Sequence, residues 1–217
     1  MPQILKVDPS SWENTLSETR KVVKAGGIVA FPTDTFYGLG VNPYNRIAVD
    51  KIYKIKGRDP EKPLLLLIDS ISKLKNLVEE PTAACIKLMQ TFWPGPLTIL
   101  FKPKPSSIHE NISAGLIGIR KPGNPVTRNI LSALDHPLTA PSANISGDNP
   151  ATTAQQVQDI FGEKVAIILD AGECKGEKPS TVINANNNPA RLIRAGEIDF
   201  KDIQDCLNGC LQIPESL

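Results

Sequence analysis

The sequence predicts an α/β fold in which a twisted mixed sheet is covered by flanking helices. The first support is a set of short apolar runs without polar alternation, such as 64–68, because such runs are typical of strands covered on both faces. The second is a set of amphipathic segments between those runs, of which 11–25 is the first. Runs and segments alternate along the chain, and this order is the pattern of a layered α/β protein.

The predicted helices have recognisable start and stop signals. Gly26-Gly27 ends the amphipathic segment over 11–25 and frees the chain for a strand. Asn45 is a good N-cap for a second helix, and that helix must stop near Gly57. Further helices are expected near 70–78, 82–92, 125–134, 154–161 and 199–207.

The apolar runs define the strands, and the segments between them define the loops. Strands are expected at 28–31, 64–68, 97–101, 116–119, 165–169, 181–183 and 191–193. The stretch 103–113 is the longest irregular segment and is a candidate lid on that ground alone. The sequence shows no repeat and no linker, so a single domain over 1–217 is expected, with a C-terminal helix and tail over 199–217.

Composition excludes several classes of protein. Of the 217 residues, 41% are hydrophobic and 22% are charged, which is ordinary for a globular chain and far from a disordered one. The net charge of +1 indicates neither a nucleic-acid-binding nor a membrane-binding protein, so any anion site must come from local clustering. The four cysteines lack metal-ligand spacing, and no signal or membrane-spanning segment is present. We therefore expect a cytoplasmic protein with reduced thiols, no structural metal and no membrane partner.

The first polar cluster is Thr33-Asp34-Thr35, which follows the predicted strand 28–31. Asp and Thr side chains commonly bond to nearby backbone N–H groups, so a capped turn accounts for the cluster. Hydroxyl and carboxylate groups at the end of a buried strand also suit the rim of a binding site. The residues alone leave these two interpretations equal.

The second cluster places Lys54, Lys56, Arg58 and Lys62 at a helix end and in the loop after it. Cations near a helix C-terminus interact favourably with the helix dipole, which is one explanation. That explanation does not account for Arg58, which follows Gly57 shortly before a buried strand. The arginine fork suits phosphate or carboxylate, so an anionic ligand such as a nucleotide is expected here.

Two more arginines lie at strand ends. Arg120 leaves an apolar strand into a Pro-Gly-Asn-Pro turn. It is placed to meet a carboxylate or phosphate, but a surface ion pair is the more common role for such a residue. Arg194 ends another strand, and Ser180 lies at the start of a neighbouring one.

A run of small polar residues contains Thr139, Ser142, Asn144 and Ser146. Their spacing in an extended segment places hydroxyls and an amide on one face, where a ligand can approach the backbone closely. A helix that starts after Thr153, or one residue earlier, would direct its first N–H groups towards an anion. A polar edge strand is the competing interpretation.

Motifs for other nucleotide-binding and catalytic classes are missing. The sequence contains neither G-x-x-x-x-G-K-[ST] nor G-x-G-x-x-G, so it has no P-loop and no Rossmann fingerprint. His109 and His136 are isolated, and nothing marks a Ser/His/Asp arrangement. Each histidine is interpreted as a surface or packing residue.

Six stretches occur in series, and together they are highly specific: "FPTDTFYGLG", "KIKGRDPEKPL", "WPGPLTIL", "IGIRKPGNP", "PLTAPSANISG" and "PSTVI…LIRAGEI". In this order they resemble the YrdC-like threonylcarbamoyl-AMP synthases over about residues 10–198. The resemblance includes the family's K-x-R and S-x-N hallmarks. It implies a YrdC-like fold, with the sheet curved around a large cationic cavity, in a short, single-domain form. The sequence departs from some relatives at Leu67, where they place a polar residue near the ligand.

The resemblance implies an enzyme that condenses L-threonine, bicarbonate or CO2, and ATP into threonylcarbamoyl-AMP and pyrophosphate. Magnesium would accompany ATP, and a downstream tRNA threonylcarbamoyl transferase would receive the adenylate. The site residues carried over by motif are Thr35, Arg120 and Ser180 for L-threonine, and Lys56, Arg58, Lys62, Ser142, Asn144 and Arg194 for ATP. No catalytic residue is assigned, because neither step demands a protein nucleophile. Which residue, if any, takes the amine proton is left open, with Asp34 as one possibility.

Two other classes of function compete with this one. A non-catalytic module that binds tRNA or double-stranded RNA would also need a cationic concave surface, but a near-neutral chain with three tyrosines offers few stacking groups. Weak tRNA binding remains a possible partner property of the enzyme itself. The third is the YrdC-like domain of a larger carbamoyl-transfer enzyme for hydrogenase maturation. Such enzymes carry zinc-finger and acylphosphatase segments that this sequence lacks.

Overall fold

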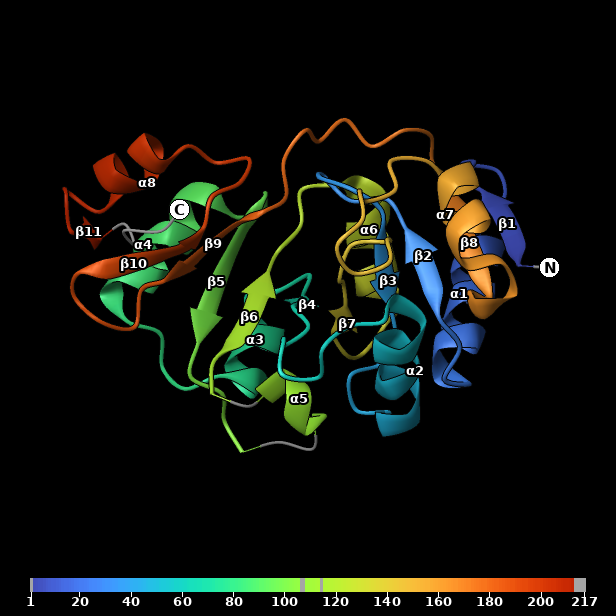
Figure 1. Ribbon diagram of the computed structural model, residues 1–217, viewed down its shortest axis with the longest axis horizontal. Helices are drawn as coiled ribbons and strands as arrows, with labels where there is room; N and C mark the ends of the chain where they lie inside the picture. Colours follow the sequence, from blue (N-terminus) through green and yellow to red (C-terminus); the bar gives the residue numbers. More distant parts are fainter. Residues whose placement is uncertain (1, 106–107, 114, 213–217) are drawn as a thin grey trace.

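The computed structural model describes residues 2–105, 108–113 and 115–212. Its strands form a four-stranded sheet and a seven-stranded sheet (Figure 1). The first sheet has the order β1 (Gln3–Lys6), β8 (Ile167–Asp170), β2 (Val29–Phe31) and β3 (Gly38–Gly40). The second has the order β11 (Leu211–Gln212), β10 (Ala190–Arg194), β9 (Thr181–Asn184), β5 (Leu97–Phe101), β6 (Ile117–Arg120), β4 (Leu66–Leu67) and β7 (Leu138–Thr139).

Both sheets are mixed, which confirms the predicted fold class. In the smaller sheet β8 runs parallel to β1 and β2, while β3 is antiparallel to β2. In the larger sheet β5 runs parallel to β9 and antiparallel to β6, and β4 is parallel to β6. The sequence suggested one sheet, because strand patterns do not reveal where a sheet divides.

Thr139 connects the two sheets. It belongs to β7 of the larger sheet, and its hydroxyl bonds to the backbone of β3 in the smaller sheet and of the residues just after β3. Thr139 Oγ1 accepts from the Val41 N–H at 3.0 Å and donates to the Leu39 carbonyl oxygen at 3.1 Å. The Thr139 N–H donates to the Val41 carbonyl oxygen at 3.2 Å. Thr139 is fully buried, so these bonds join β3 to β7 in a dry environment.

The helices follow the sequence signals closely. They are α1 (Trp12–Lys24), α2 (Arg46–Lys56), α3 (Ile71–Leu77), α4 (Ala83–Phe92), α5 (Glu110–Ser113), α6 (Pro125–Ala133), α7 (Ala154–Phe161) and α8 (Phe200–Cys206). The Asn45 side chain accepts from the Ala48 N–H, and Gly57 ends α2 with a φ of 56°. Both ends of α2 are therefore as predicted, since capping is a local interaction.

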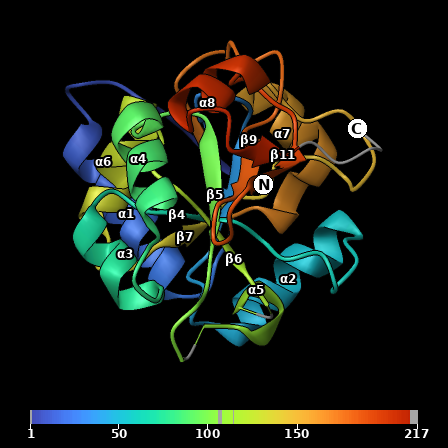
Figure 2. The same ribbon diagram turned by 90° about the vertical axis from the view of Figure 1, so that its left-hand side faces the viewer.

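The helices cover the sheets in two groups. Figure 2 shows α1, α3, α4 and α6 on one side of the strands and α2 and α7 on the other. Val23, Ile130 and Leu131 of α1 and α6 pack with Phe31 of β2 and Leu138 of β7 in one buried cluster. No helix among the described residues is long and apolar enough to cross a bilayer.

Strand β3 lies in what the sequence predicted to be a glycine-rich loop. A Cβ on Gly40 would lie 2.6 Å from Cε1 of Phe31, so the ring of the neighbouring strand requires a glycine there. Glycine is depleted in strands, and the sequence pattern therefore indicated a loop. Strand β1 was not predicted either. The apolar run 64–68 forms ladder hydrogen bonds only over β4, although all but one of its residues are buried.

The segment 103–113 contains α5, which the sequence did not predict. Ile108 and Ile112 are buried in the core. The His109 N–H donates to the Pro43 carbonyl oxygen at 3.1 Å, and His109 Nε2 lies 3.0 Å from Oδ1 of Asp50 in α2. None of the described residues of this segment lines the cavity presented below. The described residues of this segment are therefore fixed to the core and to α2, and the lid hypothesis gains no support.

Candidate active site

A cavity of about 980 Å³ opens where the loop after β2 faces the larger sheet. Its lining includes apolar side chains, such as Leu67, Leu100 and Val182, together with arginines and hydroxyl groups. Eight of the nine site residues predicted from the sequence line it: Thr35, Arg58, Lys62, Arg120, Ser142, Asn144, Ser180 and Arg194. They come from segments far apart in the chain, so the fold brings the separate motifs into one space.

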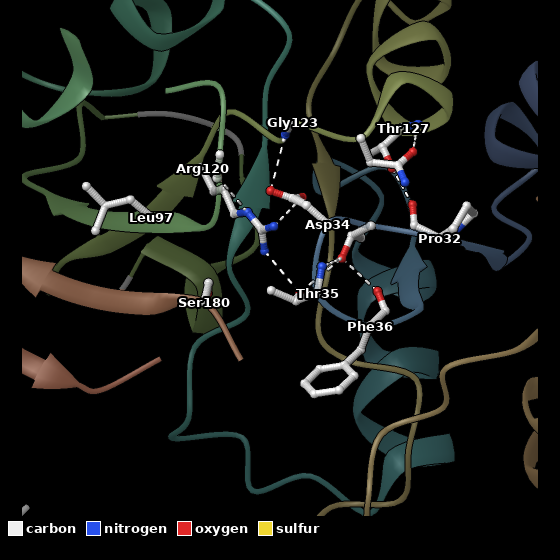
Figure 3. Close-up of polar contacts among 12 residues, drawn as sticks. Pro32, Asp34, Thr35, Phe36, Leu97, Arg120, Gly123, Thr127 and Ser180 are labelled. Atoms are coloured by element: carbon white, nitrogen blue, oxygen red, sulfur yellow. Dashed lines mark hydrogen bonds and ion pairs between the residues drawn. The ribbon is translucent and has the colours of Figure 1, made fainter. Parts of the chain in front are cut away.

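The Thr33-Asp34-Thr35 cluster forms a capped turn, and its two threonines line the cavity. As in a capped turn, Thr33 Oγ1 accepts from the Thr35 N–H at 3.1 Å and donates to the Phe36 carbonyl oxygen at 2.7 Å. The two threonine hydroxyls lie 3.0 Å apart, and both residues line the cavity. The turn bonds hold Thr35 in place at the rim (Figure 3).

Arg120, at the end of β6, is only 3% exposed. Its Nε donates to the Gly95 carbonyl oxygen at 3.1 Å, and Nη1 donates to Thr35 Oγ1 at 3.3 Å. Nη2 forms an ion pair with Oδ1 of Asp34. The sequence favoured a surface ion pair for this arginine. That expectation was wrong about location, because Arg120 is buried and lines the cavity.

Arg194 and Ser180 form the opposite side of the cavity. Arg194 Nη2 donates to the carbonyl oxygen and to Oγ of Ser180 at 2.7 and 3.0 Å. Ser180 Oγ in turn lies 2.9 Å from Thr98 Oγ1 on β5. Burial lowers the pKa of Arg194, and the positive charges of Arg120 and Arg58 lower it further. Arg194 is therefore repelled by the two other arginines of the cavity, and such a concentration of positive charge suits an anionic ligand.

Arg58 is held by the loop that follows it. Its Nε donates to the Lys62 carbonyl oxygen at 3.0 Å, and Nη2 donates to the Pro63 carbonyl oxygen at 3.0 Å. Burial lowers the pKa of Arg58, although Tyr53 and Asp59 oppose the shift. The guanidinium of Arg58 is thus fixed at the cavity wall by its own loop.

Lys56 is the one predicted site residue that does not line the cavity. It is 2% exposed, and its Nζ donates to the carbonyl oxygens of Ser142 and Asn144 at 2.6 Å each. Asn144 Oδ1 is a third acceptor at 3.3 Å. Burial lowers the pKa of Lys56 to about 8, and repulsion from Arg58 contributes. Lys56 therefore supports the S-x-N segment from behind.

The S-x-N segment presents its side chains to the cavity through local bonds. Ser142 Oγ donates to Asn144 Oδ1 at 2.6 Å, and Asn144 Nδ2 donates to the Asp148 carbonyl oxygen at 2.9 Å. The sequence also placed the start of a helix near this site. The first turn of α7 is instead closed by its own capping box, formed by Thr153 and Gln156, and neither residue lines the cavity.

Sequence reasoning did not single out Thr98, which lines the cavity and is 2% exposed. Its signal was a polar side chain two residues from Leu100 in an otherwise apolar strand, since alternate residues share a face. The carboxylates that line the cavity are Asp148 and Glu177. Among the residues that the structure describes, no group of three His, Cys, Asp or Glu side chains is arranged to hold a metal ion.

Fold and site together define an α/β protein with an arginine-rich cavity, and comparisons with known proteins specify its family. The Sua5/YciO/YrdC family model, described as telomere recombination, matches residues 21–196. The chain therefore belongs to the Sua5/YciO/YrdC family, and the resemblance predicted from the six motifs is confirmed.

Individual relatives are similar over most of this chain. A threonylcarbamoyl-AMP synthase of Pyrococcus abyssi is 36% identical over 184 residues, which make up 84% of this chain and 54% of that protein. One of Bacillus subtilis is 35% identical over 191 residues, or 87% and 55% of the two chains. The chain thus spans about half the length of these curated relatives. The crystal structure of P. abyssi Sua5 complexed with L-threonine matches with a TM-score of 0.90 at 30% identity, covering 99% of this chain and 62% of that one.

Proposed function

We propose that this protein is an L-threonylcarbamoyladenylate synthase. The substrates are L-threonine, bicarbonate or CO2, and ATP, and the products are threonylcarbamoyl-AMP and pyrophosphate. The observation that carries the proposal is the convergence of Arg58, Arg120 and Arg194 on one cavity lined by hydroxyls. Such a site suits a ligand with a carboxylate and several phosphates. The names of the relatives and the L-threonine in the P. abyssi complex support the same assignment.

The chemistry assigned to the site needs no protein nucleophile. The threonine amine attacks the carbon of CO2, a C–N bond forms, and the amine loses its proton. A carbamate oxygen then attacks the α-phosphorus of ATP, and the bond to the β-phosphate breaks to release pyrophosphate. The protein contributes by aligning three reactants and by offsetting the charge that develops on the phosphates. Among the described residues, the cavity lining is rich in arginine and hydroxyl groups and includes no cysteine or histidine, which suits this role.

We assign the substrate roles as the family resemblance implies them, and eight of the nine residues concerned line the cavity. Thr35, Arg120 and Ser180 form the threonine subsite, in which Arg120 pairs with the carboxylate. Arg58, Lys62, Ser142, Asn144 and Arg194 form the nucleotide subsite, with Lys56 behind it. Arg194 also bonds to Ser180 at 2.7 and 3.0 Å, so the two subsites share a wall.

Magnesium enters the proposal as part of the substrate Mg-ATP. Mg²⁺ bound with nucleotides is commonly held by the phosphates, by water and by one or two carboxylates. Asp148 and Glu177 are the carboxylates available on the cavity wall. The product would pass to a tRNA threonylcarbamoyl transferase, since an acyl-adenylate is an activated intermediate that a second enzyme must consume.

The first test is pyrophosphate release from Mg-ATP by the purified protein, with L-threonine and bicarbonate supplied together, singly or not at all. Release that requires both co-substrates is expected. Release that is independent of threonine would contradict the proposal. No release, together with salt-sensitive tRNA binding, would instead favour an RNA-binding module built on the same fold.

A further inference from the structure

Asp34 lies behind the rim of the cavity, between Arg120 and the turn that follows it. Its Oδ1 forms an ion pair with Arg120 Nη2. Its Oδ2 accepts from the Gly123 N–H at 3.3 Å. Figure 3 shows the carboxylate between these two groups, with Thr35 on the opposite side of the guanidinium. Asp34 follows β2 in the smaller sheet, whereas Arg120 ends β6 in the larger one, so the pair links the two sheets.

A second hydrogen bond holds the loop after β2 close to the Asp34–Arg120 ion pair. Thr127 Oγ1 donates to the carbonyl oxygen of Pro32, two residues before Asp34. Thr127 belongs to α6, and Asn124 caps that helix by accepting from the N–H groups of Val126 and Thr127. The loop after β2 is therefore fastened to both ends of the turn between β6 and α6, and the carboxylate of Asp34 has little freedom to turn away.

The contacts of Arg120 leave part of its fork available. A guanidinium has five N–H donors. Contacts with described residues engage three of them, directed to Gly95, Thr35 and Asp34. One donor on each terminal nitrogen is left for an incoming carboxylate, and the three protein contacts set the direction in which those donors point.

The negative charge of Asp34 also stabilises the buried guanidinium of Arg120. Arg120 is buried, and the positive charges of Arg120 and Arg58 already lower the pKa of Arg194. A buried guanidinium among other cations needs a nearby counterion to stay in place. Asp34 provides that charge without entering the cavity, since it is not one of the lining residues.

From this geometry we infer that Asp34 is a positioning residue for the amino-acid substrate, acting through Arg120. It holds the guanidinium with two donors directed at the substrate carboxylate. Asp34 is not among the residues that line the cavity, so its contacts with Arg120 and Gly123 favour this role over the proton-acceptor role considered from the sequence. The inference rests on the proposed function, because it takes L-threonine as the ligand of Arg120.

The test is direct binding of L-threonine and of ATP, measured separately by titration calorimetry for the wild type, Asp34→Asn and Asp202→Asn. Asp202 is an exposed residue of α8 and serves as the matched loss of one negative charge. Asp34→Asn is expected to weaken L-threonine binding about tenfold or more, as for a lost charge-assisted contact. ATP binding should change by less than about twofold, because the phosphate-binding arginines keep their own contacts. Asp202→Asn should bind both ligands as the wild type does.

Several outcomes would overturn the inference. Unchanged L-threonine affinity in Asp34→Asn would show that Arg120 needs no support from Asp34. Equal losses for both ligands, with a lower unfolding temperature, would indicate a purely structural role. If Asp34→Asn does not fold, Asp34→Glu keeps the charge but displaces the guanidinium, and L-threonine affinity should again fall selectively; unchanged affinity would contradict the inference. A wild type that binds no L-threonine would instead refute the proposed function.

Discussion

Lys56 and Asn144 lie 88 residues apart in the chain and are joined by a hydrogen bond of 2.6 Å from the lysine Nζ to the asparagine carbonyl oxygen. The same ammonium group bonds to the Ser142 carbonyl oxygen. The K-x-R and S-x-N motifs are therefore one structural unit. In this unit Arg58 lines the cavity, and Lys56 holds the backbone of the S-x-N segment, which also lines it.

Replacing Lys56 with Met should destabilise the protein and weaken ATP binding. The change removes a buried charge, which relieves a desolvation cost, but it leaves three oxygen acceptors without their donor. The second effect should be larger, with a net loss of about 1–3 kcal/mol in the free energy of unfolding. Denaturant unfolding and ATP titration measure the two effects. Lys54→Met, at an exposed position of the same helix, is the control, and equal losses in both variants would contradict the assignment.

The stability difference between the wild type and Lys56→Met should depend on pH. Burial holds the pKa of Lys56 at about 8 in the folded protein, below the ordinary value of 10.5. Between these values the folded protein binds fewer protons than the unfolded chain, so the contribution of Lys56 to the free energy of unfolding rises with pH. Unfolding curves of both proteins at several pH values from 7 to about 10.5 measure it, since other titrating groups cancel in the difference. A difference that stays constant or falls with rising pH would contradict the lowered pKa.

Arg58→Ala should impair the use of ATP far more than that of L-threonine. The guanidinium lines the cavity, and under the proposed function its removal would leave phosphate charge unpaired. We expect KM for ATP to rise at least about tenfold, with a smaller change for L-threonine. Steady-state pyrophosphate release measures both constants. Arg46→Ala, at the exposed start of α2, provides the comparison, and near-normal turnover of Arg58→Ala would remove Arg58 from the site.

Thr139→Val should loosen the junction between the two sheets. Valine matches the shape of threonine but leaves the Val41 N–H and the Leu39 carbonyl oxygen without the hydroxyl that they share. At a fully buried site this should lower the free energy of unfolding by about 1–3 kcal/mol. Chemical denaturation measures the loss, with Thr91→Val as the control because the Thr91 hydroxyl is exposed. A loss no greater than that of the control would show that the hydroxyl bonds contribute little.

Local signals in the sequence were sufficient for most helices and strands. Asn45 and Gly57 defined α2 because capping depends on a few neighbouring residues. Strand β3 was missed because its glycines are demanded by Phe31, a contact across the ladder that no local pattern records. The short helix α5 was missed because its anchoring contacts come from α2 and from the loop before it.

The site shows the same difference between what local sequence signals predict and what tertiary contacts decide. The sequence by itself determined which side chains are present and that their motifs occur in one family order, which was enough to predict eight residues of the cavity wall. Only the tertiary structure decided which groups each charged side chain contacts. It turned Lys56 away from the cavity and buried Arg120 against Asp34. The physical reason is that a buried cation must find acceptors wherever the fold supplies them, and those acceptors lie on segments distant in sequence.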